Sequence, residues 1–110
     1  MKVTWKDNEY ELKYSFRSMM LFENVTGRSF SLKTTTDSIV YFYCVLIASS
    51  GLEDVDFDEF VDWLDENPQS VVDFSNWLTR SIKAQEDKMP ASAKAAKTAK
   101  KGKTNENPKN

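Results

Sequence analysis

The stretch Ile39-Val-Tyr-Phe-Tyr-Cys-Val-Leu-Ile-Ala48 contains no charged residue and is the most apolar segment of the chain. It is too short to cross a bilayer, because a membrane-spanning helix needs about 20 such residues. Its β-branched and aromatic residues would also suit a buried strand. However, Thr36 or Asp37 can serve as a helix N-cap before it, and Gly51 can end a helix after it. We therefore predict a central helix, which must be covered by other segments because it is apolar on every side.

The N-terminal residues predict a short β-hairpin. Residues 3–6 and 9–14 are strand-like, and Asp7-Asn8 between them are typical turn residues. Side chains at period two share one face of the second strand, namely Tyr10, Leu12 and Tyr14. Two strands alone are marginally stable in water, so the hairpin is expected to lean on helices. Residues 30–32 are expected to form a brief extended piece that adds to it.

Three further helices are predicted from capping residues. Ser15 can cap a helix that runs to about Val25, with Gly27 just beyond its end. Asp56 has the spacing of a capping box with Glu59, three residues later, at the start of an acidic helix that Asn67-Pro68 would end. The last helix is expected to open at Pro68 or Ser70 and to lose its pattern near Gln85.

Helical spacing also predicts which side chains of these helices face the core. The expected inward rows are Phe16, Met19, Met20, Phe22 and Val25 in the first helix, Phe57, Phe60, Val61 and Leu64 in the acidic helix, and Val71, Phe74, Leu78 and Ile82 in the last. The fold class is therefore mainly α (α+β), a small bundle of about four helices with an N-terminal hairpin. Residues 1–86 would form this domain.

Charge divides the chain into an acidic body and a basic tail. Residues 1–86 hold eight Lys/Arg against fifteen Asp/Glu, a balance of −7, whereas residues 87–110 hold seven Lys against two acids, a balance of +5. After Met89 no apolar residue is larger than Ala, so we predict that the tail is disordered. Its expected electrostatic contacts are Lys94, Lys97, Lys100, Lys101 and Lys103. The tail has neither Arg nor aromatic residues, which does not favour nucleic acid as the partner.

Composition argues against most catalytic and metal chemistry. The chain has no His, the commonest general base and metal ligand, and its single Cys44 lies in the apolar stretch. Asp54, Asp56 and Asp58 resemble the opening of a calcium loop, but Glu59 stands where that loop needs glycine. We therefore predict no enzyme, no metal and no cofactor. The absence of a signal peptide and the lone Cys predict a reducing cytoplasm as the compartment.

Several apolar side chains are candidates for a partner-binding patch. Trp63 lies off the apolar row of its helix and has acidic neighbours, which is typical of a contact residue but slightly more so of a helix covered on a wider arc. Met residues suit adaptable grooves, although they fill cores more often. The expected partner-binding residues are Met19, Met20, Phe60, Trp63 and Trp77.

Residues 10–30 resemble the start of the tail assembly chaperones of long-tailed bacteriophages. The chaperone signature Phe-Glu-x-x-Thr-Gly-x-x-Phe is matched by Phe22, Glu23, Thr26, Gly27 and Phe30. The apolar central helix and the acidic helix after it are also similar, so the resemblance covers about residues 9–84. The Trp5 hairpin is not part of it.

The resemblance implies a small helical protein of the host cytoplasm that is absent from the finished virion. Such chaperones bind the long, apolar tape-measure protein and help tail-tube subunits assemble around it. The tape-measure protein, and with it the tail-tube protein, are therefore the expected partners, and a homo-oligomer stays open. The alternative is a small adaptor or nucleic-acid-associated protein that acts through its basic tail. Its sign would be DNA binding that depends steeply on salt.

Overall fold

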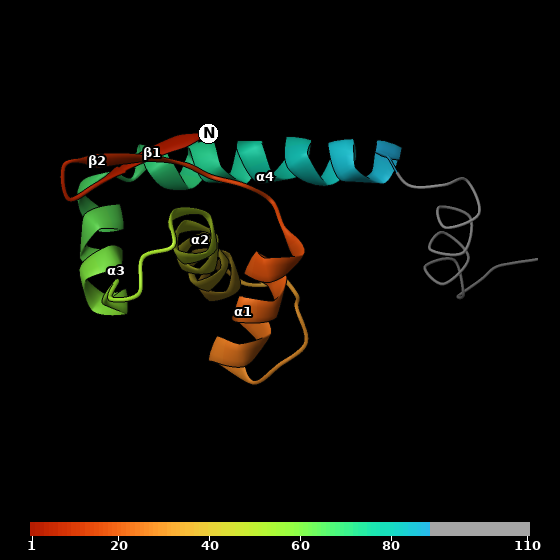
Figure 1. Cartoon of the computed structure of the whole chain (residues 1–110), viewed down its shortest axis with the longest axis horizontal. Coiled ribbons are helices and arrows are strands. Elements are labelled where there is room, and N and C mark those ends of the chain that lie inside the picture. Colours follow the sequence, from red (N-terminus) through yellow and green to blue (C-terminus); the bar gives the residue numbers. More distant parts are fainter. Residues whose placement is uncertain (89–110) are drawn as a thin grey trace, which may run out of the picture. The chain divides into compact units, whose positions relative to one another are not determined.

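The computed structural model describes residues 1–88 of the chain. Within this range, strands β1 (Lys2–Trp5) and β2 (Asn8–Glu11) precede helices α1 (Phe16–Thr26), α2 (Thr35–Ser50), α3 (Phe57–Glu66) and α4 (Gln69–Lys88) (Figure 1). The predicted fold class, mainly helical with an N-terminal hairpin, is confirmed. The chain divides between Thr79 and Arg80 into two units, and the contacts discussed below lie within the first. Of the second unit, residues 80–88 are described and continue α4 as helix. The predicted tail disorder lies outside the described residues.

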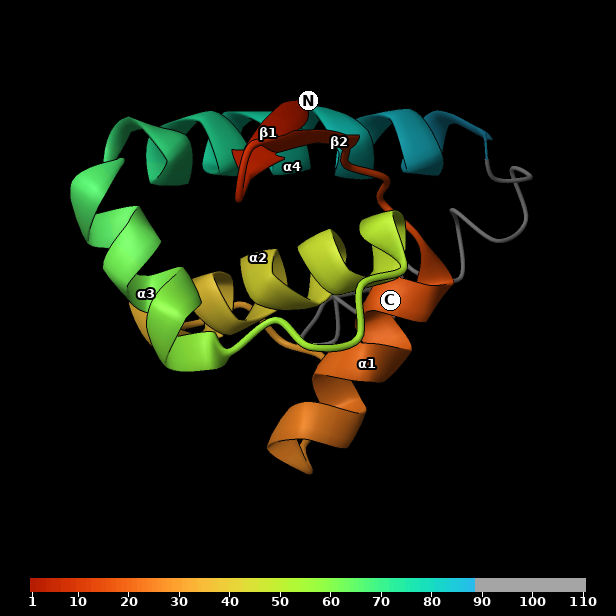
Figure 2. The same cartoon turned by 60° about the vertical axis from the view of Figure 1, so that its left-hand side comes forward.

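Helix α2 is the centre of the first unit, as the apolar stretch predicts. The side chains most deeply buried in the fold include five from this helix, which are Tyr41, Phe42, Cys44, Val45 and Leu46. Figure 2 shows α2 running between α3 and α1, with its C-terminal end beside α1. Gly51 ends the helix with a φ of 77°, a left-handed conformation that glycine adopts without steric cost.

The start of α2 differs from the prediction. The N-cap is Thr34, rather than Thr36 or Asp37, and its side chain accepts a hydrogen bond from the Asp37 backbone N–H at 3.0 Å. The Asp37 carboxylate accepts in return from the Thr34 N–H, which completes a capping box. Three threonines precede Asp37 in the sequence, so composition alone did not distinguish which of them caps the helix.

Aromatic side chains from several elements pack against Phe42 of α2. Its ring stacks on Phe74 of α4, with centroids 4.2 Å apart and planes 3° apart. Phe60 of α3 meets it edge-on at 5.2 Å. The apolar rows predicted for α3 and α4 face this core, since Phe60, Leu64, Phe74 and Leu78 are all buried. The core of the unit is therefore largely aromatic.

The hairpin turns one residue earlier than predicted. Trp5 pairs with Asn8, so the turn consists of Lys6 and Asp7, whose φ values are 48° and 69°. Two residues with positive φ are typical of the tight turn whose twist matches that of paired strands. Asp7-Asn8 looked like the turn because both residue types favour turns, but strand pairing places Asn8 in β2. The buried side chains of this region are Val3, Trp5 and Leu12.

Helix α1 begins after Ser15 and ends before Gly27 as predicted, but its inward face is only partly the predicted one. Phe22 is buried as expected, whereas Phe16, Met20 and Val25 are 73%, 63% and 52% exposed and Ser18 is buried instead. A polar contact turns Ser18 toward the core, since its hydroxyl lies 2.8 Å from the Tyr41 hydroxyl of α2 and the two share a buried hydrogen bond. A row chosen by apolar residues alone could not reveal a serine on the contact face.

The prediction of an extended piece at residues 30–32 that adds to the hairpin is wrong. Within the described residues the sheet has two strands, and residues 30–32 have no regular structure. The Phe30 N–H donates instead to the Glu23 carboxylate at 2.9 Å, so it does not contribute to a strand ladder. The Phe30 ring packs on Phe22 and Tyr41, at 5.4 and 4.8 Å between centroids.

Candidate functional site

A groove lies between α1 and the C-terminal end of α2. It encloses about 690 Å³, within the range of about 300–1,000 Å³ that is typical of binding sites. Its lining, which defines what we name the α1–α2 groove, consists of Arg17, Met20, Leu21, Asn24, Ile47, Ala48, Gly51 and Leu52. Most of these side chains are apolar, and only Arg17 is charged.

The groove is open, because among residues 1–88 no other element covers the outward face of α1. Met20 is among the most exposed large apolar side chains of the described chain, and Phe16 lies one turn before it on the same helix. At the other side, no atom lies within 4 Å of the place where a Cβ on Gly51 would stand. A partner can therefore approach the backbone of α2 closely at this end.

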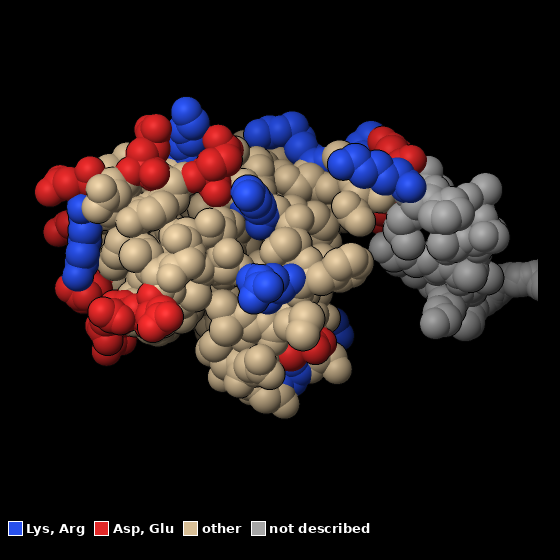
Figure 3. Space-filling view, in the orientation of Figure 1, with Lys and Arg blue, Asp and Glu red and all other residues tan. Residues whose placement is uncertain are grey.

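Acidic side chains gather elsewhere on the molecule. Figure 3 shows them on the left of the view, over α3 and the nearby hairpin turn, whereas the surface over α1 is mostly neutral with a few charges. Residues 53–66 contain eight Asp/Glu and no Lys or Arg. The chain thus combines a charged, solvating side with a largely uncharged groove.

A second hollow is a weaker candidate. It encloses about 250 Å³, below the usual size of ligand sites, between the hairpin and the segment after α2. Its lining includes Lys6 together with Glu53 and Asp54, so opposite charges are already present in its wall. In the α1–α2 groove, by contrast, the lining contains no acidic residue that could pair with Arg17.

The predicted partner-binding residues do not form one patch. Met20 lines the α1–α2 groove, and Met19 is half-buried on the same helix. Phe60 is 0% exposed, so it belongs to the core, and its prediction as a partner-binding residue is wrong. Its position in the apolar row of α3 already favoured this core role. The tail lysines Lys94, Lys97, Lys100, Lys101 and Lys103 lie outside the described residues.

Trp63 and Trp77, the two tryptophans expected to bind a partner, are half-buried parts of the aromatic core. Trp63 stacks on Phe60 at 5.9 Å and meets Trp5 edge-on at 6.1 Å between centroids. Trp77 lies 5.5 Å from Phe74. Neither residue lines the α1–α2 groove. The wider arc of α3 is therefore explained by the hairpin, which covers the side of the helix that carries Trp63.

The residues of the chaperone-like signature, which lie between Phe22 and Phe30, stabilise the end of α1 and the loop after it. Gly27 takes the left-handed conformation that ends the helix, with a φ of 70°. The Thr26 hydroxyl donates to the Phe22 carbonyl at 2.8 Å and accepts from the Arg28 N–H at 3.2 Å. With the Glu23–Phe30 hydrogen bond, these contacts fix the chain as it leaves α1. The signature shapes a loop and does not line the α1–α2 groove.

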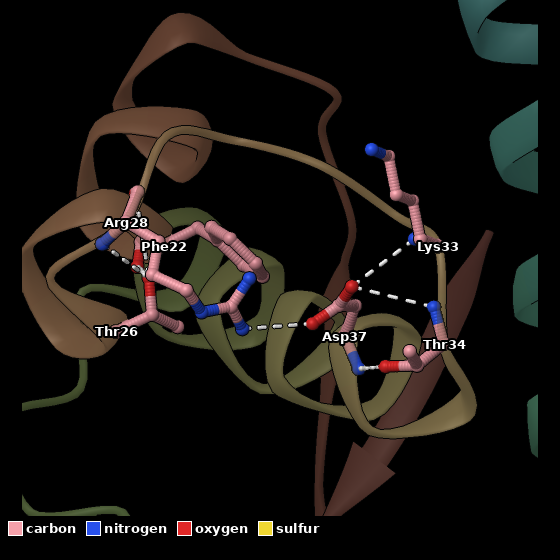
Figure 4. Close-up of polar contacts among 6 residues, drawn as sticks. All are labelled: Phe22, Thr26, Arg28, Lys33, Thr34 and Asp37. Carbon is pink, nitrogen blue, oxygen red and sulfur yellow. Dashed lines mark hydrogen bonds and ion pairs between the residues drawn. The ribbon is translucent and has the colours of Figure 1, made fainter.

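That loop positions an ion pair at the start of α2. The Arg28 guanidinium donates to the buried Asp37 carboxylate at 2.8 Å, and the Lys33 N–H donates to the same carboxylate at 3.1 Å (Figure 4). The Arg28 hydrogen bond is the main cause that lowers the pKa of Asp37, and the backbone N–H groups of Lys33 and Thr34 add to it. Sequence analysis missed this pair, because the two residues are nine positions apart across an irregular loop.

We expect Asp37→Asn to reduce stability most near neutral pH. The folded state lowers the pKa of Asp37, so its contribution is present above the ordinary value of 3.8 and is lost as pH falls through the folded-state pKa. The variant lacks this charge, so its urea midpoint should lie below that of the parent near pH 7 and approach it in strong acid. An equal difference at all pH values would contradict the assignment.

Other chemistry is sparse within residues 1–88. No group of three or more metal-ligating side chains occurs there, and no helix is long and apolar enough to span a bilayer. Burial raises the pKa of the Cys44 thiol to about 12, so the thiol is protonated at neutral pH. Burial likewise raises the pKa of Tyr41 to about 12. Both side chains are part of the core.

Sequence reasoning identified one residue of the groove lining, Met20, and missed the others. Met20 was singled out because Met suits adaptable surfaces. Ile47 and Ala48 were missed because α2 is apolar on every side, so its pattern does not indicate which residues stay uncovered, and Leu52 lies beyond the end of that helix. Comparison with known proteins gave no matching family model, no matching curated protein and no matching solved structure.

Proposed function

We propose that this chain is a tail assembly chaperone of a long-tailed bacteriophage. It holds the apolar tape-measure protein in the host cytoplasm, promotes assembly of the tail tube around it, and leaves before the virion is complete. The resemblance of residues 9–84 to that family supports this proposal. The observation that carries it is the open, mostly apolar α1–α2 groove on a chain whose acidic side chains gather elsewhere.

A holding protein needs two surfaces of opposite character. Its client site must be apolar, because burial of apolar area supplies most of the driving force of association. The rest of its surface must be charged, so that copies carrying an exposed apolar site repel one another. The groove with Met20 meets the first need, and the acidic segment of residues 53–66 meets the second.

Met20→Asp is expected to reduce capture of tape-measure segments by about tenfold or more. Burying a Met side chain contributes about 1.5–3 kcal/mol, and each 1.4 kcal/mol is a factor of ten in affinity. The full chain, tagged, would be co-expressed with overlapping segments of the tape-measure protein of the same phage, and the co-purified segment would be quantified. The substitution is at an exposed site, so the fold should persist.

Val72→Asp is the matched control. Val72 is 51% exposed on α4 and does not line the groove, so the same change there should leave capture intact. Failure of the parent chain to retain any tape-measure segment would count against the proposed function. Equal capture by the parent and the Met20→Asp variant would exclude the groove as the contact surface.

A further inference from the structure

We propose that the α1–α2 groove binds the apolar face of an amphipathic helix, and that Arg17 selects a helix with an Asp or Glu beside that face. This inference rests on the proposed function only in taking the groove as the contact surface. It specifies the chemistry of the client segment, which the function itself leaves open.

The geometry of the groove suits a helix as the occupant. Its walls are two helices, and the described lining contains no strand whose backbone could pair with an extended peptide. Recognition by an exposed sheet edge is therefore not available here, whereas a helix can lay its apolar face between two helices. Ala48 and Gly51 leave room for close approach at one end, and the flexible Met20 side chain can adapt to the ridges of the incoming helix.

Arg17 supplies the charge selection. It is the only charged residue of the lining, it is exposed, and among residues 1–88 its guanidinium makes no ion pair. Arg28, by contrast, is already paired with Asp37. A partner that covers the groove would remove water from around Arg17, so a carboxylate at the edge of its apolar face would replace those contacts.

The acidic body of the protein does not cancel this preference. At physiological salt, charges on the surface are screened beyond about 8 Å, so a contact pair with Arg17 outweighs distant carboxylates. None of the acidic residues between Glu53 and Glu66 lines the groove. The acidic body slows the approach of an acidic helix, but the contact pair decides which bound helix is retained.

The test is a display library of helical peptides of about 18 residues, long enough to form isolated helices. Each peptide carries Leu at helical spacing and randomised residues beside that stripe. Baits are the full chain, Arg17→Glu, Arg17→Gln and the control Arg80→Glu, which alters a cation outside the groove lining. We expect the parent and Arg80→Glu to enrich Asp/Glu over Lys/Arg about fivefold, Arg17→Gln to show no preference, and Arg17→Glu to reverse it.

A Met20→Asp bait should lower recovery of every helical peptide about tenfold, which places binding in the groove. Equal enrichment of acidic and basic flanks by the parent, or a preference that Arg17→Glu leaves unchanged, would overturn the inference. Loss of tape-measure capture with the Arg17-dependent preference retained would remove only the proposed function. Capture that depends on Met20 but shows no charge preference would remove only this inference.

Discussion

Phe42→Ala is expected to lower the free energy of unfolding by about 3–5 kcal/mol. Phe42 is 1% exposed at the centre of α2, where its ring stacks on Phe74 and meets Phe60 edge-on. Alanine would remove the apolar contacts of the ring and also leave a cavity, because its neighbours on α3 and α4 collapse only in part. A domain is stable by only about 5–15 kcal/mol, so the variant should be close to unfolding.

Urea denaturation followed by far-ultraviolet circular dichroism would measure this loss. Val72→Ala is the control, because the same kind of truncation at an exposed site usually changes stability by less than about 0.5 kcal/mol. Phe42→Leu should fall between the two, since leucine refills part of the cavity. A loss below about 1.5 kcal/mol for Phe42→Ala would show that the aromatic core repacks freely and that α2 is not its rigid centre.

Local signals made most of the fold predictable. Ser15 with Gly27, and Asp56 with Asn67, bracket α1 and α3 as expected, because a cap acts within a few residues of the chain. The uncharged run at residues 39–48 indicated the buried centre, since such a run has to be covered. These features are properties of contiguous sequence, so they can be read without knowledge of the partners in space.

Apart from the α2 cap and the hairpin turn, which differ by one to three residues, the errors concern polar contacts between separate segments. The rotation of α1 depends on the Ser18–Tyr41 hydrogen bond, and the loop after it depends on Glu23 accepting from Phe30. Both are polar contacts that hydrophobic spacing does not register. The groove was only partly predictable for a related reason, because one of its sides is a part of α2 that no other described element covers. An uncovered surface is known only once every covering element has been placed.

Trp5→Ala is expected to release the hairpin from the helices. It should lower the free energy of opening the hairpin by about 3–5 kcal/mol. Trp5 is 6% exposed, and its ring contacts Phe60 and Trp63 at 6.0 and 6.1 Å between centroids. The hairpin has only two strands and is marginal without such support, so the loss should appear first as local opening.

Hydrogen exchange distinguishes local opening from a general loss of stability. In Trp5→Ala the N–H of Leu12, which donates to the Met1 carbonyl, should lose protection, while amides in the middle of α2 should keep theirs. Lys2→Gln is the control, because its ion pair with Glu9 lies within the hairpin, is exposed and is worth at most about 1 kcal/mol. Unchanged exchange at Leu12 in the Trp5 variant would mean that β1 is held by other contacts, of which Val3 is the remaining buried one.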